Sequence, residues 1–70
     1  MPIGFAEEGK EYVIVRLGGN TAVKHHLSDM GFHVGGKITL VQKAQEGFIV
    51  GVKGARIALG RDLASKIFVE

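Results

Sequence analysis

The chain has 70 residues, no cysteine, and a net charge of +2 from nine basic and seven acidic side chains. This length predicts one domain over residues 1–70, and the missing cysteine excludes disulfides and thiolate metal sites. No apolar run approaches the ~20 residues that cross a membrane, and the first residues lack the pattern of a signal peptide. We therefore expect a cytoplasmic domain that is not embedded in a membrane.

The first predicted strand covers residues 12–17, "YVIVRL", which are rich in β-branched and aromatic types and precede a Gly-Gly pair. Side chains alternate between the two faces of a strand. We expect the inward face to consist of Val13, Val15 and Leu17, and the outward face of Tyr12, Ile14 and Arg16.

A short helix is predicted over residues 21–30, where the apolar spacing changes to that of a helix. Its apolar stripe consists of Val23, Leu27 and Met30. Asn20 or Thr21 can cap the start by accepting a backbone N–H bond. Gly31 follows the stripe at the place of a left-handed cap, and Phe32 stands where a Schellman motif has its apolar contact.

Three further strands are predicted over residues 37–43, 48–53 and 56–59, followed by a helical turn at 61–66 and a fifth strand at 67–69. The inward residues are expected to be Ile38, Leu40, Phe48, Val50, Val52, Ile57, Leu59, Leu63 and Ala64. Gly54-Ala55 is predicted as the two-residue turn of a tight hairpin. Five short strands and two helical pieces indicate a mainly β fold, a small closed or nearly closed barrel.

Three histidines stand close together in "HHLSDMGFH", residues 25–33. On a helical wheel, His25 points away from the apolar stripe and lies above Asp29, whereas His26 lies at the edge of the stripe. Pairs such as His25 with Asp29, or His26 with His33, offer two ligands, fewer than the four of a structural zinc site. We expect an exposed His25–Asp29 pair, a boundary His26 and a loop His33, and a weak contact with a divalent transition metal is the alternative left open.

The chain offers little for catalysis. It has no cysteine nucleophile, no serine in a strand–turn–helix elbow and no phosphate-binding or dinucleotide fingerprint. We therefore expect a protein that is not an enzyme and requires no cofactor. Nucleic acid is not the expected partner either, because the basic pair Lys53 and Arg56 lacks exposed aromatic side chains beside it.

Several blocks of the sequence stand in an order that resembles the ferrous iron transport protein A (FeoA) family. They are "LSDMGF" from Leu27, "GGKI" from Gly35, "RIALG" from Arg56, and Ala64. The resemblance implies an SH3-like, five-stranded β-barrel with one short helix after the first strand and a helical turn before the last.

The resemblance also implies a cytoplasmic accessory protein of ferrous iron uptake, an interaction module whose partner is FeoB, the membrane permease with a cytosolic G-protein domain. The capped helix is the expected docking element, with partner-binding residues His25, His26, Leu27, Asp29, Met30, Gly31 and Phe32. The helical wheel places Leu27 mostly in the core. A homodimer is left open.

Two alternatives come from other protein classes. The C-terminal barrel of iron-dependent repressors is similar to this family, so a detached metal-responsive regulatory domain is one. A complete repressor is not expected, because no DNA-reading region is present. A small RNA-binding barrel is the other, and it is disfavoured by the modest charge and the few aromatic residues.

Overall fold

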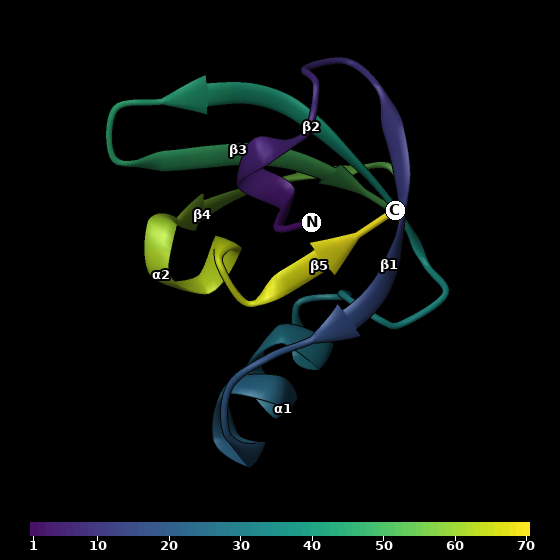
Figure 1. The fold of residues 1–70 in the computed structure, drawn as a ribbon, viewed down its shortest axis with the longest axis vertical. Coiled ribbons are helices and arrows are strands. Elements are labelled where there is room, and N and C mark those ends of the chain that lie inside the picture. Colours follow the sequence, from purple (N-terminus) through teal and green to yellow (C-terminus); the bar gives the residue numbers. More distant parts are fainter.

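The computed structural model describes all residues, 1–70, as five antiparallel strands with two helices and a 3-10 turn (Figure 1). The elements are η1 (Ile3–Phe5), β1 (Glu11–Leu17), α1 (Thr21–Asp29), β2 (Lys37–Ala44), β3 (Gly47–Val52), β4 (Ala55–Gly60), α2 (Arg61–Ala64) and β5 (Ile67–Val69). The predicted strands and helices are confirmed in type and order. No helix of the chain is long and apolar enough to cross a membrane.

The strands form one sheet in the order β4-β3-β2-β1-β5. The sheet curves because β1 pairs with β2 at its start and with β5 along its end, with an irregular register between Ile14 and Arg16. A second irregularity interrupts the β2–β3 ladder between Leu40 and Gln42. Such irregularities bend strands and let a small sheet wrap around its own core. The two edge strands, β4 and β5, are joined by α2 and do not pair with each other.

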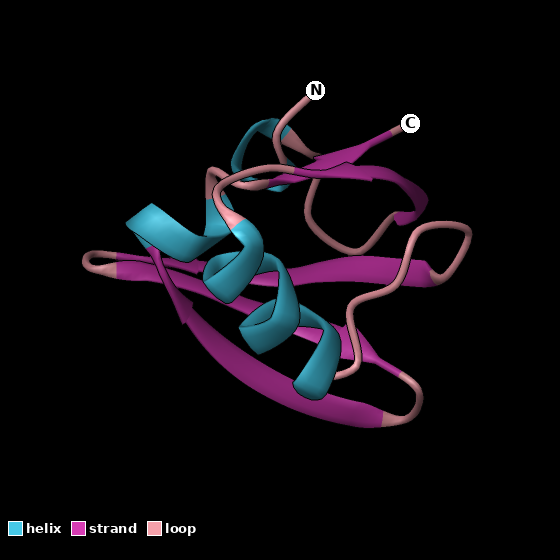
Figure 2. Ribbon diagram, turned by 90° about the horizontal axis from the view of Figure 1, so that it is seen from below, coloured by secondary structure: helices cyan, strands magenta, loops and turns pink.

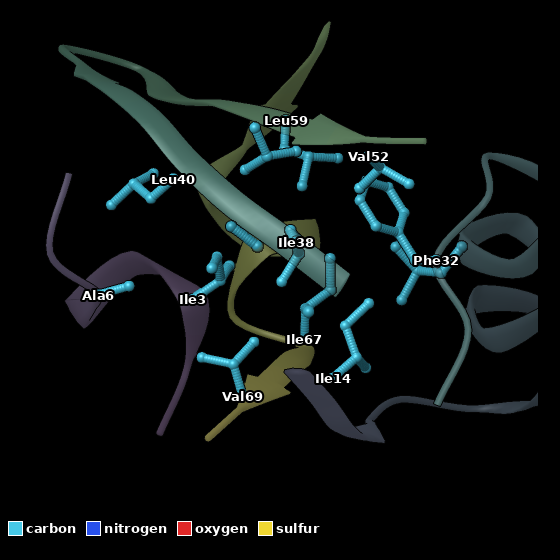
Figure 3. Packing of buried hydrophobic residues seen from close by; sticks show 13 residues of the cluster. Ile3, Ala6, Ile14, Phe32, Ile38, Leu40, Val52, Leu59, Ile67 and Val69 are labelled. Carbon is cyan, nitrogen blue, oxygen red and sulfur yellow. The ribbon is translucent and has the colours of Figure 1, made fainter. Parts of the chain in front are cut away.

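The core is one cluster of thirteen buried apolar residues. Figure 3 shows these side chains converging from strands on several sides, with Phe32 arriving from beyond the end of α1 and lying beside Val52. Ile38, Leu40, Val50, Val52 and Leu59 point inward as predicted. Phe48, Ile57 and Leu63 are only partly buried and pack against the edge of the cluster, whereas Ala64 is fully enclosed.

The predicted facing of β1 is wrong. Ile14 is 1% exposed, whereas Val13 and Val15 are 41% and 42% exposed. Both faces of this strand carry β-branched residues, so alternation alone does not decide which face is buried. The pairing with β2 decides it, because Tyr12 stands opposite the core residue Ile38 and Ile14 follows on the same side.

The β3–β4 turn lies one residue earlier than predicted, at Lys53-Gly54 instead of Gly54-Ala55. Val52 pairs with Ala55, and the two residues between them have φ values of 51° and 78°. Two successive positive φ angles are typical of the type I′ hairpin turn, which matches the twist of the strands it joins. Lys53 is therefore a turn residue, not the last residue of β3.

The N-terminal segment is folded onto the barrel, which the sequence did not predict. Ile3 and Ala6 belong to the core, and Pro2 forms a bridge to Phe68 of β5. The N-terminal ammonium donates to the Val69 carbonyl at 2.9 Å. This segment covers one end of the core that the five strands leave open.

The corrected facing of β1 gives a matched pair of stability variants. We expect Ile14→Ala to lower the free energy of unfolding by about 3 kcal/mol, because it leaves a cavity in a small core. Val15→Ala removes a surface methyl pair from the same strand and is expected to cost less than about 1 kcal/mol. Urea denaturation measures both. Equal losses would contradict the observed orientation of the strand.

Candidate functional site

Helix α1 begins at a side-chain cap, as the sequence predicted. The Asn20 side-chain oxygen accepts a hydrogen bond from the Val23 N–H at 2.9 Å, which satisfies a backbone donor that the first turn leaves free. Val23 is partly buried and Leu27 fully buried, so the predicted stripe does face the core.

The other end of α1 forms a complete Schellman motif. Gly31 has a φ of 101°, its N–H donates to the Ser28 carbonyl at 2.9 Å, and the Phe32 N–H donates to the Leu27 carbonyl at 3.0 Å. Leu27 and Phe32 are both 0% exposed. The hydrogen-bonded pair that closes the helix is therefore also the pair of side chains that anchors it in the core.

The outer side of α1 carries exposed polar side chains near the C-terminal end of the helix. His25, His26 and Asp29 are exposed, and Met30 is partly buried. Figure 1 shows α1 at one end of the molecule, below β1 and β5, and Figure 2, seen from below, shows it in front of the sheet. The expected docking element is thus accessible along its polar side.

Two of the expected partner-binding residues need correction. Leu27 and Phe32 have no exposed surface, so neither can touch a partner without local unfolding. Their contribution to any docking is to fix the position and direction of α1. Of the expected residues, a partner can reach His25, His26 and Asp29 and the exposed parts of Met30 and Gly31.

The expected metal ligands do not gather into a cluster. No three His, Asp or Glu side chains of the chain lie close enough together to hold a metal ion. His25 and Asp29 are not ion-paired, since the one ion pair in the chain joins the Lys37 Nζ and a Glu11 oxygen at 3.9 Å. The His33 Nδ1 lies 3.4 Å from the Ser28 Oγ.

The sequence predicted none of the three surface hollows of the structure, and two of them join residues from distant parts of the chain. One is apolar, has a volume of about 270 Å³ and lies between η1 and α2, where Phe5 is 77% exposed beside Phe48. The other is polar, has a volume of about 310 Å³ and lies across the strands near Lys53 and Arg56. Their residues come from distant parts of the chain, so no local pattern signals them.

Comparison with known protein families gives one match that covers the whole chain. Residues 1–70 match the FeoA domain. A curated relative, named Fe(2+) transport protein A of Methanocaldococcus jannaschii, is 35% identical over 69 residues, which are 99% of this chain and 84% of the relative.

Solved structures share the fold. A crystal structure of the iron uptake regulatory protein FeoA has a TM-score of 0.90 at 27% identity, covering 99% of this chain and 93% of that one. The zinc complex of Stenotrophomonas maltophilia FeoA, described as a prokaryotic SH3 domain protein, has a TM-score of 0.84 at 24% identity, covering 100% and 89%. These similarities confirm the expected SH3-like fold.

A metal-activated repressor contains the same barrel. The apo form of the manganese-activated repressor ScaR has a TM-score of 0.90 at 25% identity. The alignment covers all of this chain but only 34% of the repressor chain. The barrel of this chain therefore also occurs as one part of a larger regulatory protein.

The cap of α1 can be tested without disturbing its packing. A Cβ on Gly31 would meet Val52 Cγ1 at 3.6 Å, an ordinary contact, so Gly31→Ala is strained only by the left-handed backbone. We expect it to lower the free energy of unfolding by about 1 kcal/mol. Gly51→Ala, at an extended position with no atom closer than 3.5 Å, is the control and is expected to be neutral or stabilising. Thermal denaturation compares the two variants. An equal loss of stability in both would argue against a specific requirement for glycine at the end of α1.

Proposed function

This chain belongs to the FeoA domain family, and from that premise we propose that it is a cytoplasmic accessory protein of ferrous iron uptake. Its partner in this proposal is the cytosolic face of a FeoB-type membrane permease, which it binds and regulates through helix α1. The protein acts as a non-catalytic interaction module formed by one domain over residues 1–70.

The observation that carries the proposal is the combination of a buried inner side and an exposed outer side on α1. Leu27 and Phe32 fix the end of the helix in the core, while His25, His26 and Asp29 remain exposed. A surface held in place before binding loses little conformational entropy when a partner docks. This arrangement suits a recognition helix.

The character of the interior supports a role without catalysis. No polar or charged side chain is buried. Catalytic groups usually depend on a desolvated setting that perturbs their chemistry, and side chains on an open surface lack it. The proposed function therefore requires neither an active site nor a bound cofactor.

A metal-responsive regulatory barrel is a second candidate, favoured by the similarity to the manganese-activated repressor ScaR. In this candidate a divalent transition metal binds near His25, His26, Asp29 or His33 and changes the affinity for a partner. Two protein ligands with water give weak binding, far from the closed four-ligand shell of a structural site. The two candidates differ in whether metal is needed for docking.

Docking through α1 is tested by titrating the ¹⁵N-labelled chain with the cytosolic region of the permease. Amide shifts are expected to concentrate on residues 24–33. The double substitution His25→Ala with Asp29→Ala is expected to weaken binding about tenfold without loss of folding, because both side chains are exposed and unpaired.

The matched control is Lys43→Ala with Glu46→Ala, which removes one basic and one acidic exposed side chain at the far β2–β3 hairpin. It is expected to bind as the unaltered chain does. Unchanged affinity in the α1 double variant, or shifts centred on other elements, would place the interface elsewhere.

Metal dependence is tested on the same sample under anoxic conditions. With saturating Fe²⁺ or Mn²⁺, the thermal midpoint is expected to stay within about 2 °C of that of the metal-free protein, because a two-ligand surface site adds little binding energy to the folded state. A larger rise, removed by His25→Ala or His33→Ala, would favour the metal-responsive barrel.

A further inference from the structure

A polar groove crosses the outer face of the sheet. Residues that stand opposite one another in the ladders form a row over four strands: Glu11 of β1, Thr39 of β2, Gly51 of β3 and Arg56 of β4. The neighbouring residues along β2 and β3, such as Ile38 and Val50, point into the core, so this row faces solvent. The groove has a volume of about 310 Å³.

Gly51 lines the groove and leaves its part of the surface without a side chain. A Cβ built on Gly51 would lie 3.5 Å from the nearest Val41 methyl and 3.9 Å from Thr39 Cβ, which are ordinary contacts. Neither packing nor backbone conformation therefore requires glycine at this position. Glycine inside a strand weakens it, and it often marks a place where another backbone or a ligand approaches closely.

The net charge of the chain is concentrated around this groove. Lys37, Lys53 and Arg56 line it together with one acidic residue, Glu11. These are three of the nine basic and one of the seven acidic residues, so the excess of two positive charges equals that of the whole chain. The rest of the chain is balanced.

These cations are available to a ligand. Lys37 has only the long 3.9 Å contact with Glu11, in which both side chains are more than half exposed, at 72% and 60%. Such a pair is weak in water. Lys53 and Arg56 are exposed and take part in no ion pair.

The walls of the groove favour a peptide as the occupant. No aromatic side chain lines it, so a base of a nucleotide or nucleic acid has no surface on which to stack. Four strands at about 4.8 Å spacing span about 14 Å, the length of about four extended residues. Arg56 offers the planar fork that binds a carboxylate through two hydrogen bonds.

We propose that this groove binds an acidic peptide segment of a partner protein, which crosses the four strands with its backbone over Gly51 and its carboxylates on Lys37, Lys53 and Arg56. The groove lies on the outer face of the sheet, whereas α1 packs on the core side through Leu27. The proposal thus goes beyond docking through α1, and either can fail without the other.

The first test titrates the ¹⁵N-labelled chain with a synthetic peptide of about four consecutive glutamates flanked by glycine and serine. Amide shifts are expected to concentrate on residues 37, 39, 51, 53 and 56. Raising the salt from about 0.05 M to about 0.5 M is expected to weaken binding at least about fivefold, because exposed charges are screened. The same peptide with glutamine at every glutamate is expected not to bind.

Matched variants then distinguish specific binding in the groove from a general attraction of the peptide to positive charge. Gly51→Ala is expected to weaken peptide binding at least about threefold while the thermal midpoint does not fall, because the methyl group fills the floor of the groove. Gly60→Ala, which adds the same methyl to open space outside the groove, is the control.

A second pair of variants tests the charge of the groove. Arg56→Gln is expected to weaken peptide binding about tenfold, whereas Lys24→Gln, the same charge change on α1, is expected to weaken it less than about twofold.

Three outcomes would overturn the proposal. One is equal binding of the glutamine peptide, and another is equal weakening by Arg56→Gln and Lys24→Gln. The third is preferential binding of a single-stranded oligothymidylate to the same residues, which would assign the groove to nucleic acid. If Gly51→Ala lowers the thermal midpoint, glycine has a structural role there, and the Arg56 and Lys24 pair decides whether the peptide binds.

Discussion

The structure depends on one small core that every element must share. Thirteen buried apolar residues serve a chain of 70, and they come from η1, from each of the five strands, from α1 and its cap, and from α2. A domain of this size buries only about 60% of the surface that its unfolded chain exposes. Every element therefore contributes to the same core, and a change at the α1 cap is expected to lower the stability of the whole barrel.

Because the core takes up the apolar side of every element, both proposed binding surfaces lie on the outside of the barrel. The interior holds no polar or charged side chain. The exterior is formed by elements that all pack against one core. Helix α1 is fixed by Leu27 and Phe32 and presents polar side chains to solvent, and the sheet presents a basic groove on its other side. These are the two surfaces that we propose for binding.

The sequence predicted the site in part. The exposure of His25 and Asp29 followed from the helical wheel, because a short amphipathic helix has only one side that the core can accept. His26, expected at the edge of the apolar stripe, is exposed as well. The same wheel placed Leu27 mostly in the core, although the family resemblance also made it an expected partner-binding residue, and the structure places it wholly in the core. The groove around Gly51 could not be predicted, because its residues come together only through the register of four strands.

The sequence by itself determined the elements whose signals are local. Asn20 and Gly31 mark the ends of α1, and alternating apolar residues mark the strands, because capping and side-chain alternation act within a few residues. The tertiary structure alone decided which face of β1 is buried, where the N-terminal segment packs, and that the excess positive charge meets at one groove. Each of these depends on pairing between residues distant in the chain, which no local pattern records.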